Sequence, residues 1–184
     1  MNKLPLVISK KVSFYFCIFS LILLSSCTET PEKIFDTAIL NTNVINDFAS
    51  PDLARHINDE TKEFPDIPSS KKKGDEAATT IKNKVLYMEQ SLEKVKKLST
   101  SGEQEKEIKD LSIRLYELVI PVYKNEYMNY AKLCDKKANQ EAKDAIIKDI
   151  EQKYGMRFQE NYNALMEKGK AYASDHNIQV NWGQ

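Results

Sequence analysis

A helical repeat of apolar residues in residues 75–98 limits the fold more than any other feature of the sequence. Apolar side chains recur there in alternating steps of three and four: Ala78, Ile81, Val85, Met88, Leu92 and Val95. This spacing places them along one face of an α-helix, whereas a strand would alternate at every second residue. A helix with one apolar face buries it against other elements. Residues 75–98 are therefore predicted to form one helix of a bundle.

Two longer segments carry similar patterns. In residues 103–134 the apolar positions are Ile108, Leu111, Leu115, Leu118, Val122, Tyr127, Tyr130 and Cys134. In residues 140–174 they are Ala142, Ala145, Ile146, Ile150, Tyr154, Phe158, Tyr162, Leu165, Gly169 and Tyr172. Short connections between helices imply antiparallel neighbours. Because residues 135–139 contain neither Gly nor Pro, one very long helix is the alternative.

The N-terminal part of the chain contains two helix-start signals. Thr30-Pro31 and Ser50-Pro51 each place a capping hydroxyl before a proline, which the first helical position tolerates. We expect a first helix from residue 31 to about residue 48. A shorter second helix should follow and bury Leu53, Ala54, Ile57 and Phe64. Residues 65–74 contain two prolines, two serines and a glycine, which predicts a loop in which the lysines are solvated.

Together these segments predict an all-α fold: a mostly antiparallel four-helix bundle with a short extra helix. The whole chain has only five glycines, too few for the turns of a β protein of this size. The bundle domain is expected to occupy residues 31–174, followed by a C-terminal tail at residues 175–184.

A second constraint lies near the start of the chain, where an apolar run ends in a cysteine. The first 27 residues contain three lysines and no acidic residue, and residues 12–24 are apolar apart from two serines. This run is shorter than the roughly 20 residues that a membrane-spanning helix needs. It closes with Leu24-Ser25-Ser26-Cys27. These four residues resemble the lipobox of bacterial lipoproteins, at which a prolipoprotein is lipidated on the cysteine and then cut.

The resemblance implies that Cys27 carries diacylglyceryl and acyl lipid, and that signal peptidase recognises the three residues before it. Residues 1–26 are then a cleaved signal peptide, and residues 27–30 are the lipidated cysteine and a short tether. Two or three acyl chains hold a protein stably on a membrane. In bacterial lipoproteins an Asp directly after the lipidated cysteine retains the protein in the inner membrane. This chain has Thr28 there, so the resemblance implies the outer membrane. The alternatives are an ordinary secretory signal or a retained transmembrane helix.

Charge and residue chemistry exclude several function classes. From Cys27 onwards the chain has 24 basic and 27 acidic residues, so its net charge of −3 argues against a nucleic-acid partner. After Cys27 only Cys134 remains, which we expect to be a buried apolar side chain. The two histidines lack the spacing of a metal or haem motif. We therefore predict no enzyme, no catalytic residue, no metal, and no cofactor besides the lipid.

One level of the predicted bundle combines two residues that weaken helices with several tyrosines. A turn centred near residue 138 pairs residue i with about residue 276 − i, which places Pro121 opposite Gly155 and Tyr130 at the Ala145-Ile146 level. Proline should kink its helix. Tyr123 and Tyr127 lie near this level, so these two tyrosines with Pro121 and Gly155 form a candidate ligand or partner site. The competing interpretation is that the tyrosines belong to the core.

Two functions remain open. The first is a non-catalytic envelope lipoprotein that binds a protein partner, as an adaptor, a chaperone or a toxin-neutralising module. The second is a lipoprotein whose helical bundle binds a small ligand or a metal ion. An exposed hydrophobic surface would favour the first, and an enclosed cavity near Pro121 and Gly155 would favour the second.

Overall fold

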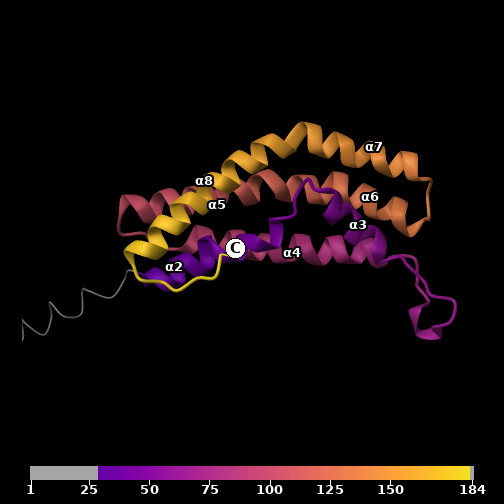
Figure 1. Ribbon diagram of the computed structural model, residues 1–184, viewed down its shortest axis with the longest axis horizontal. Helices are drawn as coiled ribbons and strands as arrows, with labels where there is room; N and C mark the ends of the chain where they lie inside the picture. Colours follow the sequence, from indigo (N-terminus) through magenta and orange to yellow (C-terminus); the bar gives the residue numbers. More distant parts are fainter. Residues whose placement is uncertain (1–28, 183–184) are drawn as a thin grey trace, which may run out of the picture.

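The computed structural model describes residues 29–182, and within this range the protein is all-α, without strands (Figure 1). The α-helices are α2 (Pro31–Ala38), α3 (Pro51–Asp59), α4 (Glu76–Lys97), α5 (Glu103–Val122), α6 (Met128–Asp135), α7 (Gln140–Ile150) and α8 (Met156–Asp175). Two 3₁₀ segments, η1 (Leu40–Ile45) and η2 (Pro68–Ser70), and two π-helical segments, η3 (Tyr123–Tyr127) and η4 (Glu151–Gly155), complete the elements. The prediction of an all-α chain is confirmed.

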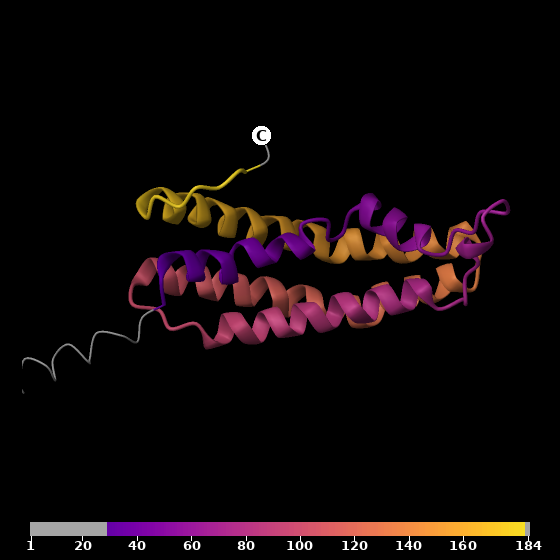
Figure 2. The same ribbon diagram turned by 90° about the horizontal axis from the view of Figure 1, so that it is seen from below.

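The helices lie side by side in a bundle-like arrangement. Helix α4 packs against α5 and α6, while α8 packs against α5 and α7 against α6. The N-terminal segments run alongside these rods, with α2 contacting α4, α5 and α8 and with α3 contacting α4 and α6 (Figure 2). The Asp135 carboxylate at the end of α6 accepts the Ala77 and Ala78 N–H groups, each at 3.0 Å, and so fixes the start of α4. No helix in the described part of the chain has the length and apolarity to cross a membrane.

The predicted helix starts are confirmed, but the first helix is shorter than predicted. Thr30 Oγ1 accepts the Lys33 N–H at 3.3 Å, and Ser50 Oγ accepts the Leu53 N–H at 3.2 Å. Helix α2 ends at Ala38 instead of residue 48 and gives way to η1. There the Thr42 hydroxyl donates to the Ile39 carbonyl at 2.6 Å, a local bond that competes with the regular helical pattern.

Helix α3 also ends earlier than the predicted pattern, at Asp59. The Thr61 hydroxyl donates to the Asn58 carbonyl at 2.8 Å just beyond this end. Phe64, predicted to be buried on this helix, is 56% exposed in the following loop. Because Phe64 precedes Pro65, helical backbone is disfavoured at that residue. The expectation for Phe64 was therefore wrong.

The two C-terminal rods form an antiparallel pair with nearly the predicted register. Lys168 Nζ lies 2.8 Å from Glu107 Oε2, and the Tyr154 hydroxyl donates to Glu126 Oε1 at 3.0 Å. The numbers of these partners add up to 275 and 280, close to the predicted 276. A break at residues 136–139 separates the rods, so the alternative of one very long helix is wrong.

Each C-terminal rod contains a π-helical turn, and in the first rod it directly follows Pro121 and Val122. The core residues around these turns follow one another in repeated steps of four: Val119, Tyr123, Tyr127 and Ala131 in one rod, and Ile150, Tyr154, Phe158 and Tyr162 in the other. In a regular α-helix each step of four overshoots a full turn by about 40°, so the row would drift off the core face. A π turn contains more residues and keeps the row facing inwards.

The residues of the lipobox lie outside the described part of the chain. This applies to Leu24, Ser25, Ser26 and Cys27, and to the whole signal peptide assigned to residues 1–26. The structure therefore leaves their assignment a prediction from the sequence.

Candidate functional site

The structure brings Pro121, Tyr123, Tyr127 and Gly155, hereafter the tyrosine level, to one height of the bundle. Pro121 ends α5 together with Val122, both tyrosines belong to η3, and Gly155 ends η4. The Tyr154–Glu126 hydrogen bond joins the two π turns at this height. A Cβ added to Gly155 would lie 3.9 Å from the Ala49 Cβ, an ordinary contact.

The rings of the tyrosine level are packed inside the protein. Tyr123 and Tyr127 are both 0% exposed and stack on one another with ring centroids 4.7 Å apart. Phe48 lies 5.9 Å from each of them and 4.9 Å from Phe158. Aromatic pairs at these distances contribute about 0.5–1.5 kcal/mol beyond area burial. These rings fill the core at this level, where an open site would leave them in contact with solvent.

The two buried hydroxyl groups have different environments. The Tyr127 hydroxyl accepts the Ala49 N–H at 3.0 Å, whereas the Tyr123 hydroxyl has no hydrogen-bond partner among the described residues. Burial, followed by the nearby Asp47 carboxylate, raises the pKa of Tyr123 well above its ordinary value. Asp47 also binds Lys84 at 3.1 Å, and Lys84 Nζ lies 5.2 Å from the centre of the Tyr123 ring. Both tyrosines are therefore held neutral.

Tyr130 lies near the predicted height, but of the two residues predicted at its level only Ile146 packs against the core. The Tyr130 hydroxyl donates to the Ala54 carbonyl at 3.0 Å, and its side chain lines a pocket together with Asp144 and Ile147. Ala145 is exposed and does not lie in the core. The π turn at residues 151–155 changes the phase of α7 relative to α8, so a single helical pattern drawn through both helices misplaces Ala145.

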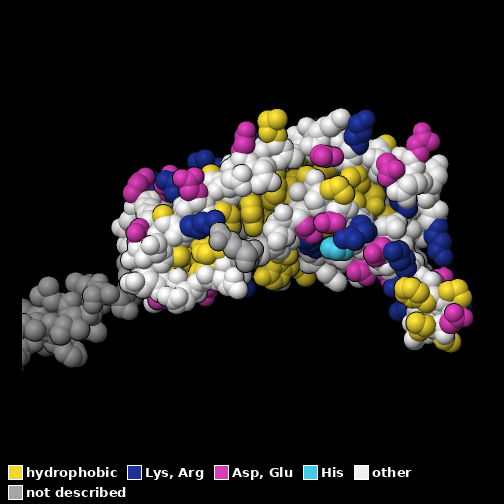
Figure 3. All heavy atoms as spheres, in the orientation of Figure 1, with side chains coloured by type: hydrophobic (Ala, Val, Ile, Leu, Met, Phe, Trp, Pro, Cys, Tyr) yellow, Lys and Arg dark blue, Asp and Glu magenta, His cyan; other side chains and the backbone are white. Residues whose placement is uncertain are grey.

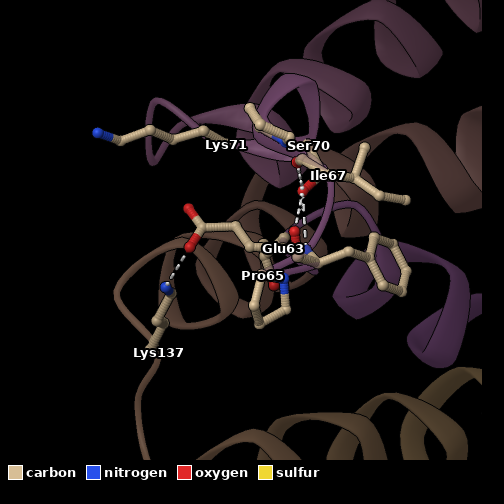
Figure 4. A pocket seen from close by; sticks show the side chains of 9 residues that line it. Glu63, Pro65, Ile67, Ser70, Lys71 and Lys137 are labelled. Carbon is tan, nitrogen blue, oxygen red and sulfur yellow. Dashed lines mark hydrogen bonds and ion pairs between the residues drawn. The ribbon is translucent and has the colours of Figure 1, made fainter.

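An apolar surface lies in the loop between α3 and α4, which projects from the end of the bundle (Figure 1). Phe64 and Ile67 are 56% and 50% exposed there, and apolar atoms gather at the tip of the loop (Figure 3). A pocket of about 630 Å³ is lined by Thr61, Glu63, Phe64, Pro65, Ile67, Pro68, Ser70, Lys71 and Lys137 (Figure 4). Four of these nine side chains are apolar, and the others include one carboxylate and two lysines.

Ser70 organises this loop from inside. Its single hydroxyl proton lies between the Ile67 carbonyl at 2.7 Å and the Phe64 carbonyl at 3.0 Å, and its oxygen accepts the Phe64 N–H at 2.8 Å (Figure 4). The Ile67 N–H also donates to the Phe64 carbonyl at 2.9 Å. These bonds satisfy the backbone of the turn although its side chains face solvent. The loop is thus ordered before any partner binds.

The base of the loop is fixed by two glutamates. Glu63 Oε1 accepts the Lys72 N–H at 3.0 Å, and Lys137 Nζ lies 3.4 Å from Glu63 Oε2. The Lys72 N–H, followed by Lys137, lowers the pKa of Glu63. Glu76 accepts the Lys73, Gly74 and Asp75 N–H groups at 2.6, 3.0 and 3.2 Å. We refer to residues 61–74 as the apolar loop.

Sequence reasoning recognised the loop and missed its surface. The prolines and the glycine indicated a loop, but Phe64 was assigned to the core and the lysine triplet to a solvated turn. Lys71 is exposed as expected, yet it lines the pocket. An aromatic residue directly before proline, with Ile67 and Pro68 close behind, was the available signal of an apolar loop.

Residues 29–182 contain no group of three or more His, Cys, Asp or Glu side chains arranged to hold a metal ion. Cys134 is buried, and burial raises the pKa of its thiol. A thiol in such an environment is a poor nucleophile. Comparison of the chain with protein-family models, curated proteins and solved structures finds no match.

Proposed function

We propose that this protein is a lipid-anchored lipoprotein of the bacterial cell envelope that binds a protein partner and catalyses no reaction. It would act as an adaptor, a chaperone or a toxin-neutralising module. Its helices are assigned to a mostly antiparallel four-helix bundle, with the segmented stretch from α2 to α3 as the fourth rod. The observation that carries the binding role is the apolar loop, which exposes Phe64 and Ile67 on a backbone that is already ordered.

The physical argument rests on desolvation and preorganisation. Exposed large apolar side chains that lie together mark interaction sites, because burying them in a partner releases their hydration water. Ordering a flexible loop on binding would cost free energy for each immobilised side chain. The Ser70 bonds and the Glu63 contacts have already ordered this backbone. Lys71 favours a partner whose apolar side chain is flanked by an acidic residue, while Lys137 is already paired with Glu63.

The position of the loop agrees with an anchor at Cys27. Helix α2 begins at one end of the molecule, and the apolar loop projects from the other end (Figure 1). Helix α4 has 22 residues and so covers about 33 Å of this length. A lipidated Cys27 a few residues before Pro31 would hold one end at the bilayer and leave the loop free for a partner. The outer membrane is the proposed location, since Thr28 follows the cysteine.

The partner is tested by capture from native envelopes with the membrane-anchored protein. We expect Phe64→Ser combined with Ile67→Ser to lose the captured protein, because this change removes the apolar surface and leaves the core intact. The matched control is Leu86→Ser combined with Tyr87→Ser, since these side chains are 54% and 44% exposed on α4. Capture that survives the loop variant, or that is lost equally in the control, would contradict the proposal.

The anchor is tested separately by lipid labelling. Cells that express the Cys27→Ser variant should yield an unprocessed or soluble protein that takes up no labelled palmitate. The parent chain should be labelled and fractionate with the outer membrane. Normal labelling of the variant would end the lipoprotein assignment, whatever the loop binds.

The alternative of a small-ligand or metal-binding lipoprotein was tied to a cavity near Pro121 and Gly155. The complete burial of Tyr123 and Tyr127 at this level gives it no support there.

A further inference from the structure

A groove of about 540 Å³ lies between η1, α8 and the C-terminal tail. Its lining includes four side-chain amides, two aromatic rings and one ammonium group: Asn43, Asn46, Asn163, Asn181, Tyr162, Trp182 and Lys170. The lining residues include no carboxylate. This combination differs from that of the apolar loop, which contains no asparagine and lies between α3 and α4.

The local backbone aligns these amides. A 3₁₀ helix repeats every three residues, so Asn43 and Asn46 point in one direction at the end of η1. On α8, Tyr162, Met166 and Lys170 follow in steps of four along the facing side. Gly169 allows η1 and α8 to come this close, because a Cβ there would lie 3.0 Å from Ile39 Cγ2.

The aromatic rings are fixed before any ligand arrives. Tyr162 stacks on Phe158 with centroids 5.5 Å apart, and Trp182 meets Phe35 edge to face at 5.8 Å. Lys170 Nζ lies 5.7 Å from the Trp182 ring, so its charge is engaged by the indole. Both rings are half-buried and keep part of their surface towards the groove.

We propose that this groove binds a neutral oligosaccharide. Each sugar hydroxyl is both a donor and an acceptor, and each asparagine amide offers two donors and one acceptor oxygen. The apolar C–H surface of a pyranose ring matches the surfaces of Tyr162 and Trp182. An anionic ligand would meet only one cation, already engaged with Trp182. A purely apolar ligand would desolvate the Asn43 and Asn46 amides without replacing their hydrogen bonds to water.

Trp182 makes a direct test feasible because it is the single tryptophan of the chain. The full chain is purified in a detergent without a sugar headgroup and titrated with two β-1,4-linked tetramers, cellotetraose and N-acetylated chitotetraose. Binding should change the emission of Trp182 and produce a matching heat in calorimetry. A response to one tetramer alone identifies plain or acetamido sugars as the ligand class.

The variants decide whether a response comes from this groove. Asn43→Ala and Asn163→Ala replace exposed side chains and should each weaken binding about three- to tenfold, the loss of one or two hydrogen bonds. The Phe64→Ser and Ile67→Ser variant should bind the tetramers like the parent, which separates this site from the apolar loop. Absence of any emission change and heat with both tetramers, or binding that both asparagine variants leave unchanged, overturns the proposal.

Discussion

The tyrosine level and the apolar loop are built from similar groups and differ in what surrounds them. Both combine aromatic rings with a hydroxyl that binds backbone. At the tyrosine level the Tyr127 hydroxyl binds Ala49, far away in sequence, and the rings are buried. In the loop the Ser70 hydroxyl binds residues three and six positions away, and the Phe64 ring faces solvent. Long-range hydrogen bonds accompany closure of the core, whereas local ones leave apolar side chains available.

Alkaline pH should produce the largest effect that separates the two regions. Burial raises the pKa of Tyr116, Tyr123, Tyr127 and Tyr130 far above the ordinary value of 10.0. The unfolded chain therefore loses these protons first, so stability is complete below about pH 10 and falls as pH rises further, by about 1.4 kcal/mol per pH unit for each tyrosine.

The measurement is circular dichroism of the helices recorded together with tyrosinate absorbance during an alkaline titration. Several buried tyrosines should ionise in one step with loss of helix. Burial and then Glu105 raise the pKa of Tyr172 to about 12, so this tyrosine should take part in the same step. Ionisation of all tyrosines near pH 10 with the helices intact would show that the tyrosine level is open to solvent.

A pair of phenylalanine variants should give an intermediate effect at the tyrosine level itself. Tyr127→Phe leaves the half-buried Ala49 N–H without its acceptor and should lower the free energy of unfolding by about 1–2 kcal/mol. Tyr123→Phe removes a hydroxyl that has no partner and should leave stability unchanged or slightly higher. Chemical denaturation of both variants measures the difference. Equal destabilisation by the two would mean that the Tyr123 hydroxyl also has a partner.

The smallest effect on stability is expected in the apolar loop. Ser70→Ala removes the hydrogen bonds that order the turn but no core contact, so the free energy of unfolding should change by less than about 1 kcal/mol. Amide hydrogen exchange at Phe64 and Ile67 should nevertheless accelerate, since their neighbourhood loses its local order. Ser69→Ala, at the neighbouring exposed serine, is the control. Unchanged exchange in the Ser70 variant would show that the prolines alone order the loop.

The sequence correctly predicted the helices and helix starts that depend only on residues close by in the chain. The steps of three and four from Ala78 to Val95 correctly indicated α4, and Thr30 and Ser50 indicated the starts of α2 and α3. The pairing of residue i with residue 276 − i placed Pro121 near Gly155, because a short connection between two rods leaves little freedom of register.

Features that depend on distant residues were missed. The burial of Phe48 against Tyr123 and Tyr127 depends on the chain leaving helix after Ile39, which the apolar pattern alone did not indicate. Ala145 was misplaced because one helical period was assumed across the π turn at residues 151–155. The repeated steps of four, from Val119 to Ala131 and from Ile150 to Tyr162, were the available signal for both π turns.

Each π turn behaves like one residue inserted into an otherwise regular helix. Asn125 lies in η3, is exposed, and binds only the Pro121 carbonyl through its side chain at 2.9 Å. Exchanging it for another residue should cost little. Deleting it would turn the π turn into a regular α-helical turn and leave Tyr130 and Cys134 facing the core, whereas a deletion elsewhere in α5 would rotate everything beyond by about 100°. The π turn is therefore the one place in this rod where a residue can be removed without changing the phase of the helix beyond it, a tolerance of chain length that no side-chain contact reveals.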